Sequence, residues 1–177
     1  MSIGLYRGTV ALEPHDEAWD SCARETIVKL KELLGEDLND AQHVGSTSIR
    51  SICAKPIIDI VMGVNDFESL LKYNDILEAN GFIYRGQDHP DQHLYICGQD
   101  DFITHHIHAV IYDSDTWHNY LNIRDYLNTH IEDALAYEKL KKQLCEKYPN
   151  DRKTYTSNKA SFIEGIIEKT KRRCENV

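Results

Sequence analysis

Residues 43–64 read His-Val-Gly-Ser-Thr-Ser-Ile-Arg-Ser-Ile-Cys-Ala-Lys-Pro-Ile-Ile-Asp-Ile-Val-Met-Gly-Val. The first residues end a short predicted strand, which the Gly-Ser pair breaks. After the proline, residues 57–64 form a nearly continuous apolar run rich in β-branched side chains. Such a run is typical of a central strand buried on both faces. Asp59 lies inside it, and a buried carboxylate needs a cation or hydrogen-bond donors beside it.

The turn before this strand is suited to bind phosphate. Gly45 lets an anion approach the backbone, and Ser46 and Thr47 stand where a short helical segment begins, whose free N–H groups attract negative charge. Lys55 adds a cation, and Asp59 is placed to hold a metal ion that bridges to the same phosphates. The alternatives are a serine that only caps the segment and an aspartate that only accepts backbone hydrogen bonds.

The spacing resembles the signature of the polymerase-β-like nucleotidyltransferases. That signature is an apolar residue, Gly, and Gly or Ser, followed about a dozen residues later by Asp-apolar-Asp/Glu-apolar. The matching residues are Val44, Gly45, Ser46, Asp59, Ile60 and Met62. Val61 departs from it, because it stands where the second carboxylate is expected. Since two-metal phosphoryl transfer needs bridging carboxylates, Val61 predicts one ion rather than two, manganese preferred over magnesium, and slow or absent nucleotidyl transfer.

Longer blocks resemble the GrpB family. They are His-Val-Gly-Ser-Thr-Ser-Ile at 43–49, Ala-Lys-Pro-Ile-Ile-Asp-Ile at 54–60, Thr-His-His-Ile-His at 104–108, Arg-Asp-Tyr-Leu at 124–127 and Tyr-Pro-Asn-Asp-Arg-Lys-Thr-Tyr-Thr-Ser-Asn-Lys-Ala-Ser-Phe-Ile at 148–163. The resemblance runs from about Asp16 to Ile167 and implies a nucleotidyltransferase-like fold. In some relatives a similar domain is joined to dephospho-coenzyme A kinase, which suggests nucleotide or coenzyme A metabolism. This sequence contains no Gly-x4-Gly-Lys-Ser/Thr loop, so it lacks that kinase.

Hydrophobic periodicity predicts an α+β protein with a mixed β-sheet covered by helices and a helical C-terminal third. The predicted strands are 9–12, 41–44, 57–64, 82–84, 94–97 and 102–111, and the predicted helices are 17–34, 66–80, 115–127, 131–147 and 155–172. Leu135, Leu140 and Leu144 are expected to face inward in the helix at 131–147. No linker or repeat interrupts the pattern, so residues 1–177 are predicted to form a single GrpB-like nucleotidyltransferase-fold domain.

Three histidines on the last predicted strand separate by parity. His106 and His108 share one face of the strand, and His105 lies on the other face among apolar residues. His106 and His108 are therefore candidate metal ligands with Asp59, although a His-x-His pair is also common by chance. Imidazole suits manganese, iron or zinc better than magnesium. His43 either reaches the same pocket or is a core histidine.

The remaining candidates for the site lie in the helical third. Arg124, Arg152, Tyr155 and Lys159 could form a clamp for a phosphate or carboxylate. The alternative is a solvated helix face with local ion pairs. The histidines at 89, 93, 118 and 130 have polar neighbours and are expected at the surface.

Composition limits the partners. The net charge of −9 argues against nucleic acid or an anionic membrane, both of which need a basic surface. The five cysteines are scattered without a Cys-x-x-Cys motif, no apolar run approaches about 18 residues, and the N-terminus has no signal peptide. A cytoplasmic protein with reduced thiols is therefore expected.

These observations predict a nucleotidyltransferase-like protein that binds a nucleotide or other phosphorylated metabolite with a divalent metal, manganese or magnesium, with zinc as a further possibility. If it is an enzyme, it transfers a nucleotidyl group to a small acceptor. The alternatives are a non-catalytic nucleotide-binding module and a metal-dependent hydrolase that uses His43 as well. The predicted residues are Asp59 and Lys55 for catalysis, Gly45, Ser46, Thr47, Lys55, Arg152 and Lys159 for ligand binding, and Asp59, His106 and His108 for the metal.

Overall fold

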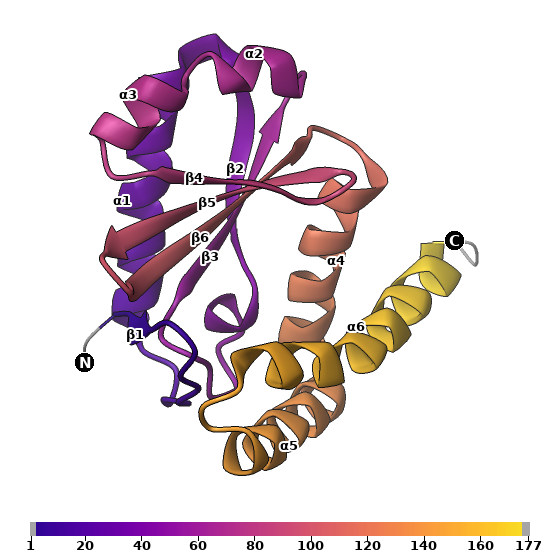
Figure 1. The fold of residues 1–177 in the computed structure, drawn as a ribbon. Coiled ribbons are helices and arrows are strands. Elements are labelled where there is room, and N and C mark those ends of the chain that lie inside the picture. Colours follow the sequence, from indigo (N-terminus) through magenta and orange to yellow (C-terminus); the bar gives the residue numbers. More distant parts are fainter. Residues whose placement is uncertain (1–2, 175–177) are drawn as a thin grey trace.

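The computed structural model describes residues 3–174, which are built around one mixed sheet (Figure 1). The strands are β1 (Leu5–Tyr6), β2 (Leu38–Val44), β3 (Ile58–Val64), β4 (Ile83–His89), β5 (Gln92–Gln99) and β6 (Phe102–Ile111). Their order is β2-β3-β6-β5-β4, and β1 pairs with the start of β6. The β3–β6 pair is parallel, and the other pairs of named strands are antiparallel. The predicted mixed sheet is confirmed.

Helices account for the rest of the regular structure. They are α1 (Glu17–Leu34), α2 (Phe67–Leu71), α3 (Asn74–Ala79), α4 (Asp115–Thr129), α5 (Ile131–Lys147) and α6 (Arg152–Cys174), with 3-10 turns η1 (Gly35–Asp37) and η2 (Ser46–Ser48). The α1 helix begins where Asp16 accepts a hydrogen bond from the N–H of Ala18, and it ends at Gly35, whose φ is 56°. The helical C-terminal third is confirmed. No helix in residues 3–174 has the length and apolar character that a membrane crossing requires.

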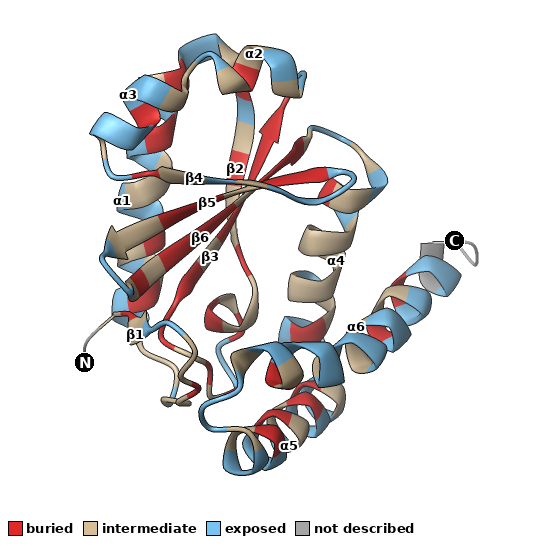
Figure 2. Cartoon of the chain, in the orientation of Figure 1, coloured by how far each residue is buried: buried red, intermediate tan, exposed pale blue. Residues whose placement is uncertain are grey.

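The two faces of the sheet pack against different helices. On one face, Ile58, Ile60 and Met62 of β3 join Trp19 and Leu30 of α1 in the largest apolar cluster. On the other face, a smaller cluster contains Val44, Val61, Val110 and Trp117 of α4. Buried residues therefore concentrate along the central strands, while α5 and α6 lie beyond α4 (Figure 2).

The α5 helix fixes the segment that leads into β3. The N–H of Cys53 donates to Oε1 of Glu138 at 2.7 Å, and the carbonyl of Cys53 accepts from Nζ of Lys141. Lys141 is only 1% exposed, and its Nζ lies 4.7 Å from the ring centroid of Tyr137. Burial, together with the nearby charge of Lys159, lowers the pKa of Lys141 to about 7. Both backbone groups of residue 53 are thus bound to one helix.

Two predicted elements at the edges were wrong. Residues 9–12 form no strand; β1 lies earlier, and Glu13 makes only an isolated bridge with Ala54. The helix predicted at 66–80 is divided into α2 and α3, because the chain turns at Tyr73, whose hydroxyl donates to Asp37 at 2.5 Å. Hydrophobic periodicity along the sequence predicts neither the bridge of Glu13 to Ala54 nor the hydrogen bond of Tyr73 to Asp37.

Two predicted exposures were also wrong. Leu135 is 48% exposed, because the buried stripe of α5 runs through Ala134, Tyr137, Lys141 and Leu144. Because Lys141 is polar in the sequence but buried in the structure, the apolar pattern predicts an inward face that includes Leu135 instead of Ala134. His93 is buried and not at the surface. Its Nδ1 lies 2.7 Å from the hydroxyl of Tyr84. The polar residues around it belong to the β4–β5 hairpin.

Replacing the buried lysine should change how stability depends on pH. Folded Lys141 has a pKa of about 7 and an unfolded lysine about 10.5, so the unfolded chain binds more protons between these values. The free energy of unfolding should therefore rise with pH in this window. In Lys141→Met that rise should be smaller by up to about 1.4 kcal/mol per pH unit. Urea unfolding at pH 7 to 9.5 measures it.

The matched control is Lys139→Met, on the exposed side of the same helix. Its pH slope should equal that of the wild type. Equal slopes for the wild type and Lys141→Met would contradict a lysine kept neutral by burial.

Candidate functional site

Asp59 stands on the α4-facing side of β3, opposite the main core. Alternation along the strand points its neighbours Ile58 and Ile60 toward α1, where both are 0% exposed. The Asp59 side chain keeps 27% of its surface accessible. In the sheet register Asp59 lies beside Val44 of β2 and His106 of β6. The carboxylate is therefore at the centre of the sheet, with an opening on one side only.

Val61 shares this strand face with Asp59. It is 0% exposed and packs with Val44, Val110 and Trp117. The position that would carry a second carboxylate is thus part of an apolar cluster. A charged side chain there would be desolvated among these apolar side chains, which is costly.

The Gly45 turn passes directly against the Asp59 carboxylate. Gly45 has φ of 70° and ψ of −170°, a conformation open mainly to glycine. A Cβ at this position would lie 2.5 Å from Oδ2 of Asp59, which is closer than atoms can approach. Ser46, the next residue, lines the same cavity as Asp59. The predicted meeting of the Gly-Ser turn and the aspartate at one pocket is confirmed.

Two imidazoles contact one oxygen of that carboxylate. Nδ1 of His106 lies 3.1 Å and Nε2 of His108 lies 3.4 Å from Oδ1 of Asp59. Burial alone disfavours the charged carboxylate, yet hydrogen bonds from both histidines hold the pKa of Asp59 well below its usual range. Burial lowers the pKa of His106, and Asp59 opposes this only in part. The pair is an ionised aspartate beside a neutral imidazole.

His105 lies on the opposite side of the sheet, as strand parity predicted. Its Nε2 is 3.3 Å from the sulfur of Cys22 and 3.2 Å from the hydroxyl of Thr26, both on α1. Burial lowers the pKa of His105 to about 4, so the ring is a neutral core group.

Three cations face Asp59 across the cavity. Lys55, Arg152 and Lys159 line a cavity of about 260 Å³ together with Gly45, Ser46, Ile57, Asp59, His106, His108, Tyr120, Tyr155 and Thr156. Both lysines lie over the ring of Tyr155, whose centroid is 5.5 Å from Nζ of Lys55 and 5.0 Å from Nζ of Lys159. Within the described residues, none of these three cations has a carboxylate within ion-pair distance.

The cavity strongly lowers the pKa of Lys55. Burial, followed by repulsion from Lys159 and Arg152, lowers its pKa to about 7, while Asp59 opposes the shift. An anion in the cavity would reverse this repulsion, so Lys55 would take up a proton when the anion binds.

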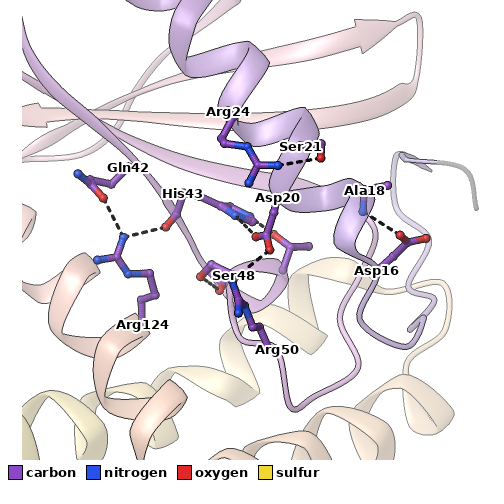
Figure 3. Close-up of polar contacts among 12 residues, drawn as sticks. Asp16, Ala18, Asp20, Ser21, Arg24, Gln42, His43, Ser48, Arg50 and Arg124 are labelled. Atoms are coloured by element: carbon purple, nitrogen blue, oxygen red, sulfur yellow. Dashed lines mark hydrogen bonds and ion pairs between the residues drawn. The ribbon is translucent and has the colours of Figure 1, made fainter.

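Thr47, His43 and Arg124 are not part of the cavity lining. Figure 3 shows the polar contacts of His43 and Arg124. Thr47 is 0% exposed, and its hydroxyl lies 2.9 Å from Nε2 of His43. Nδ1 of His43 lies 3.2 Å from Asp20 of α1, and burial lowers the pKa of this ring. Arg124 donates to the carbonyl of His43 and to Gln42, each at 3.1 Å. These residues position the end of β2.

Sequence reasoning missed Tyr120. Its ring stacks on His108 with centroids 5.1 Å apart, and its hydroxyl donates to Oε1 of Gln92 at 2.6 Å. The residue pattern of the helix does not indicate the histidine beside it.

Asp59, His106 and His108 are suited to hold one metal ion. One ligand atom from each lies within 4.8 Å of the others. The separations of 3.1 and 3.4 Å match two ligands of one ion, because bonds of about 2.0–2.2 Å place neighbouring ligand atoms about 3.0–3.5 Å apart. One carboxylate and two imidazoles favour manganese, iron or zinc over magnesium.

Comparison with known proteins places the sequence among a set of bacterial relatives. A family model described as GrpB protein matches residues 9–169. The glutamate-rich protein GrpB of Alkalihalophilus pseudofirmus is 36% identical over 176 residues, covering 93% of this chain and 98% of that protein. The UPF0157 protein YqkA of Bacillus subtilis is 32% identical and covers 89% of this chain, which matches 46% of that protein.

Solved structures agree on the fold. The conserved protein GrpB from Enterococcus faecalis matches with a TM-score of 0.84 at 29% identity, over 92% of this chain and 98% of that chain. The Cid1 poly(U) polymerase with bound Mg 3′-dATP matches with a TM-score of 0.53 at 16% identity, over 76% of this chain and 43% of that chain. At such low identity the second likeness concerns the fold alone, which is nucleotidyltransferase-like.

A methyl group at residue 45 should disturb both the turn and the carboxylate. Gly45→Ala must relieve the 2.5 Å approach to Asp59 in addition to adopting a strained backbone. The free energy of unfolding should fall by about 1–3 kcal/mol more than in Gly35→Ala, a matched glycine with φ of 56° and no atom within 4 Å. Thermal and urea unfolding of both variants provide the measurement. A smaller loss in Gly45→Ala than in Gly35→Ala would contradict the close approach.

Proposed function

The chain belongs to the GrpB family, and we propose that it binds a nucleotide or another phosphorylated metabolite together with one divalent metal ion. One observation carries the proposal: three basic side chains, none of which forms an ion pair with a carboxylate of the described residues, line the cavity that contains Asp59 and its two histidines. The chain has a net charge of −9, so a local excess of cations does not follow from composition. A phosphate group supplies the missing negative charge.

Each side chain has a distinct part in this proposal. Lys55, Arg152 and Lys159 bind the phosphate, and Ser46 donates its hydroxyl to it. Gly45 keeps the space beside the carboxylate open. Asp59, His106 and His108 would hold the metal, which when bound neutralises charge on the phosphate oxygens. If a group is transferred, we assign catalysis to Asp59, which would hold the metal, and to Lys55, whose charge would stabilise negative charge on the phosphates.

Val61 favours binding without rapid turnover. Its apolar environment leaves one carboxylate at the strand, whereas two-metal phosphoryl transfer needs ions about 3.5–4 Å apart with shared carboxylate ligands. The non-catalytic nucleotide-binding module is therefore the second candidate. A His/Asp hydrolase that uses His43 receives less support, because His43 is engaged by Asp20 and Thr47 outside the cavity lining.

Anion affinity should fall as pH rises, and Lys55 should be the cause. Free Lys55 has a pKa of about 7, and a bound anion raises that pKa, so binding takes up a proton between the two values. Tripolyphosphate affinity, measured by calorimetry from pH 7.5 to 9.5, should drop by up to about tenfold per pH unit more than in Lys55→Met. Lys72→Met, which replaces an exposed lysine outside the cavity lining, should behave like the wild type. The same slope in Lys55→Met would refute the role of Lys55.

Turnover separates the three candidates. Metal-free protein with manganese and ATP should bind ATP and release pyrophosphate slowly or not at all. Loss of ATP binding in Ser46→Ala/Lys55→Met would support the binding module if turnover is absent. Rapid pyrophosphate release with two bound magnesium ions would contradict the argument from Val61. Release of phosphate from esters without a nucleobase would instead support the hydrolase.

A further inference from the structure

The ring of His106 lies between a hydrogen-bond acceptor, Asp59, and a hydrogen-bond donor, Arg152. Its Nδ1 is 3.1 Å from Oδ1 of Asp59, and its Nε2 is 2.9 Å from Nη2 of Arg152. Arginine only donates hydrogen bonds, so Nε2 of His106 must carry a lone pair. The proton of the neutral ring is then on Nδ1, where it donates to Asp59. His108 has no comparable constraint, because its Nδ1 has no hydrogen-bond partner among the described residues.

A metal ion at Asp59 would change which nitrogen of His106 can carry the proton. For Nδ1 of His106 to bind the ion, Nδ1 must be deprotonated and the proton of the neutral ring must move to Nε2. That proton would point at the N–H groups of Arg152, which are themselves donors. Two donors cannot share a hydrogen bond, so Arg152 must leave His106 when the metal binds there.

Arg152 borders open space into which its side chain can move. It lines the cavity with Lys55 and Lys159, and it also borders a neighbouring groove with Arg7 and Lys153. No carboxylate of the described residues forms an ion pair with it. Once released from His106, its guanidinium can donate two parallel hydrogen bonds to a phosphate in the cavity.

We propose that His106 and Arg152 form a switch that couples metal binding to anion capture. Without metal, Arg152 is docked on Nε2 of His106; metal binding to Nδ1 moves the proton to Nε2 and frees Arg152 for the phosphate. This inference rests on the proposed function and adds its order of events. By reciprocity, a bound anion that attracts Arg152 also strengthens metal binding.

Two variants that remove the same charge test the switch. Arg152→Met and Lys159→Met each delete one cation from the cavity, but only the first frees Nε2 of His106. In the absence of an anion, Arg152→Met should bind manganese and zinc about ten- to a hundredfold more tightly than Lys159→Met, which is the scale of a hydrogen bond to a charged group. In the wild type and Lys159→Met, saturating zinc should increase tripolyphosphate affinity. That increase should be smaller in Arg152→Met. Calorimetry measures the metal and tripolyphosphate affinities, and circular dichroism confirms that both variants are folded.

The position of the proton provides a direct readout. Long-range proton–nitrogen NMR of the wild type should show His106 protonated at Nδ1 without metal and at Nε2 with zinc, with the signals assigned through His106→Gln. A metal-free ring protonated at Nε2 would overturn the switch, as would equal metal affinities of Arg152→Met and Lys159→Met. If the wild type binds neither zinc nor tripolyphosphate, the proposed function fails and the switch with it. Binding of both without coupling overturns the switch alone.

Discussion

An ionised carboxylate inside an apolar strand must be surrounded by donors and cations, and Asp59 imposes this requirement on separate parts of the chain. The strand β6 supplies two imidazoles on the same sheet face. The turn after β2 must carry glycine, because any side chain at residue 45 would collide with the carboxylate. The first turn of α6 and the segment before β3 add Arg152 and Lys55. The site is therefore a consequence of stabilising one partly buried charge.

The surroundings hold more positive charge than Asp59 alone requires. Repulsion among Lys55, Lys159 and Arg152, added to burial, leaves Lys55 easily deprotonated in the absence of an anion. A phosphate relieves that repulsion, which makes anion binding favourable even in an acidic protein. In the proposed site, the apolar packing of Val61 would limit the accompanying metal to one ion. These two features together favour a site that binds strongly and reacts slowly.

The sequence revealed those parts of the structure that local rules determine. Strand alternation alone separated His105 from His106 and His108, and helical spacing with its caps located α1. Predictions failed where a distant partner decides the outcome. The burial of His93 depends on the β4–β5 hairpin, and the exposure of Leu135 follows from a buried lysine that binds the carbonyl of Cys53. Tyr120 entered the site only through its stacking on His108, a contact between segments that no sequence pattern links.

The most direct test of the account is a crystal structure of the protein with manganese and a non-hydrolysable nucleoside triphosphate. Data collected at a wavelength where manganese scatters anomalously would locate the ions. One manganese peak is expected, bonded to Asp59 and at least one of His106 and His108 at about 2.0–2.3 Å, with phosphate oxygens within hydrogen-bond distance of Lys55 and Arg152. Two manganese ions, or a triphosphate bound away from Ser46 and Lys55, would contradict a single-metal phosphate site at Asp59.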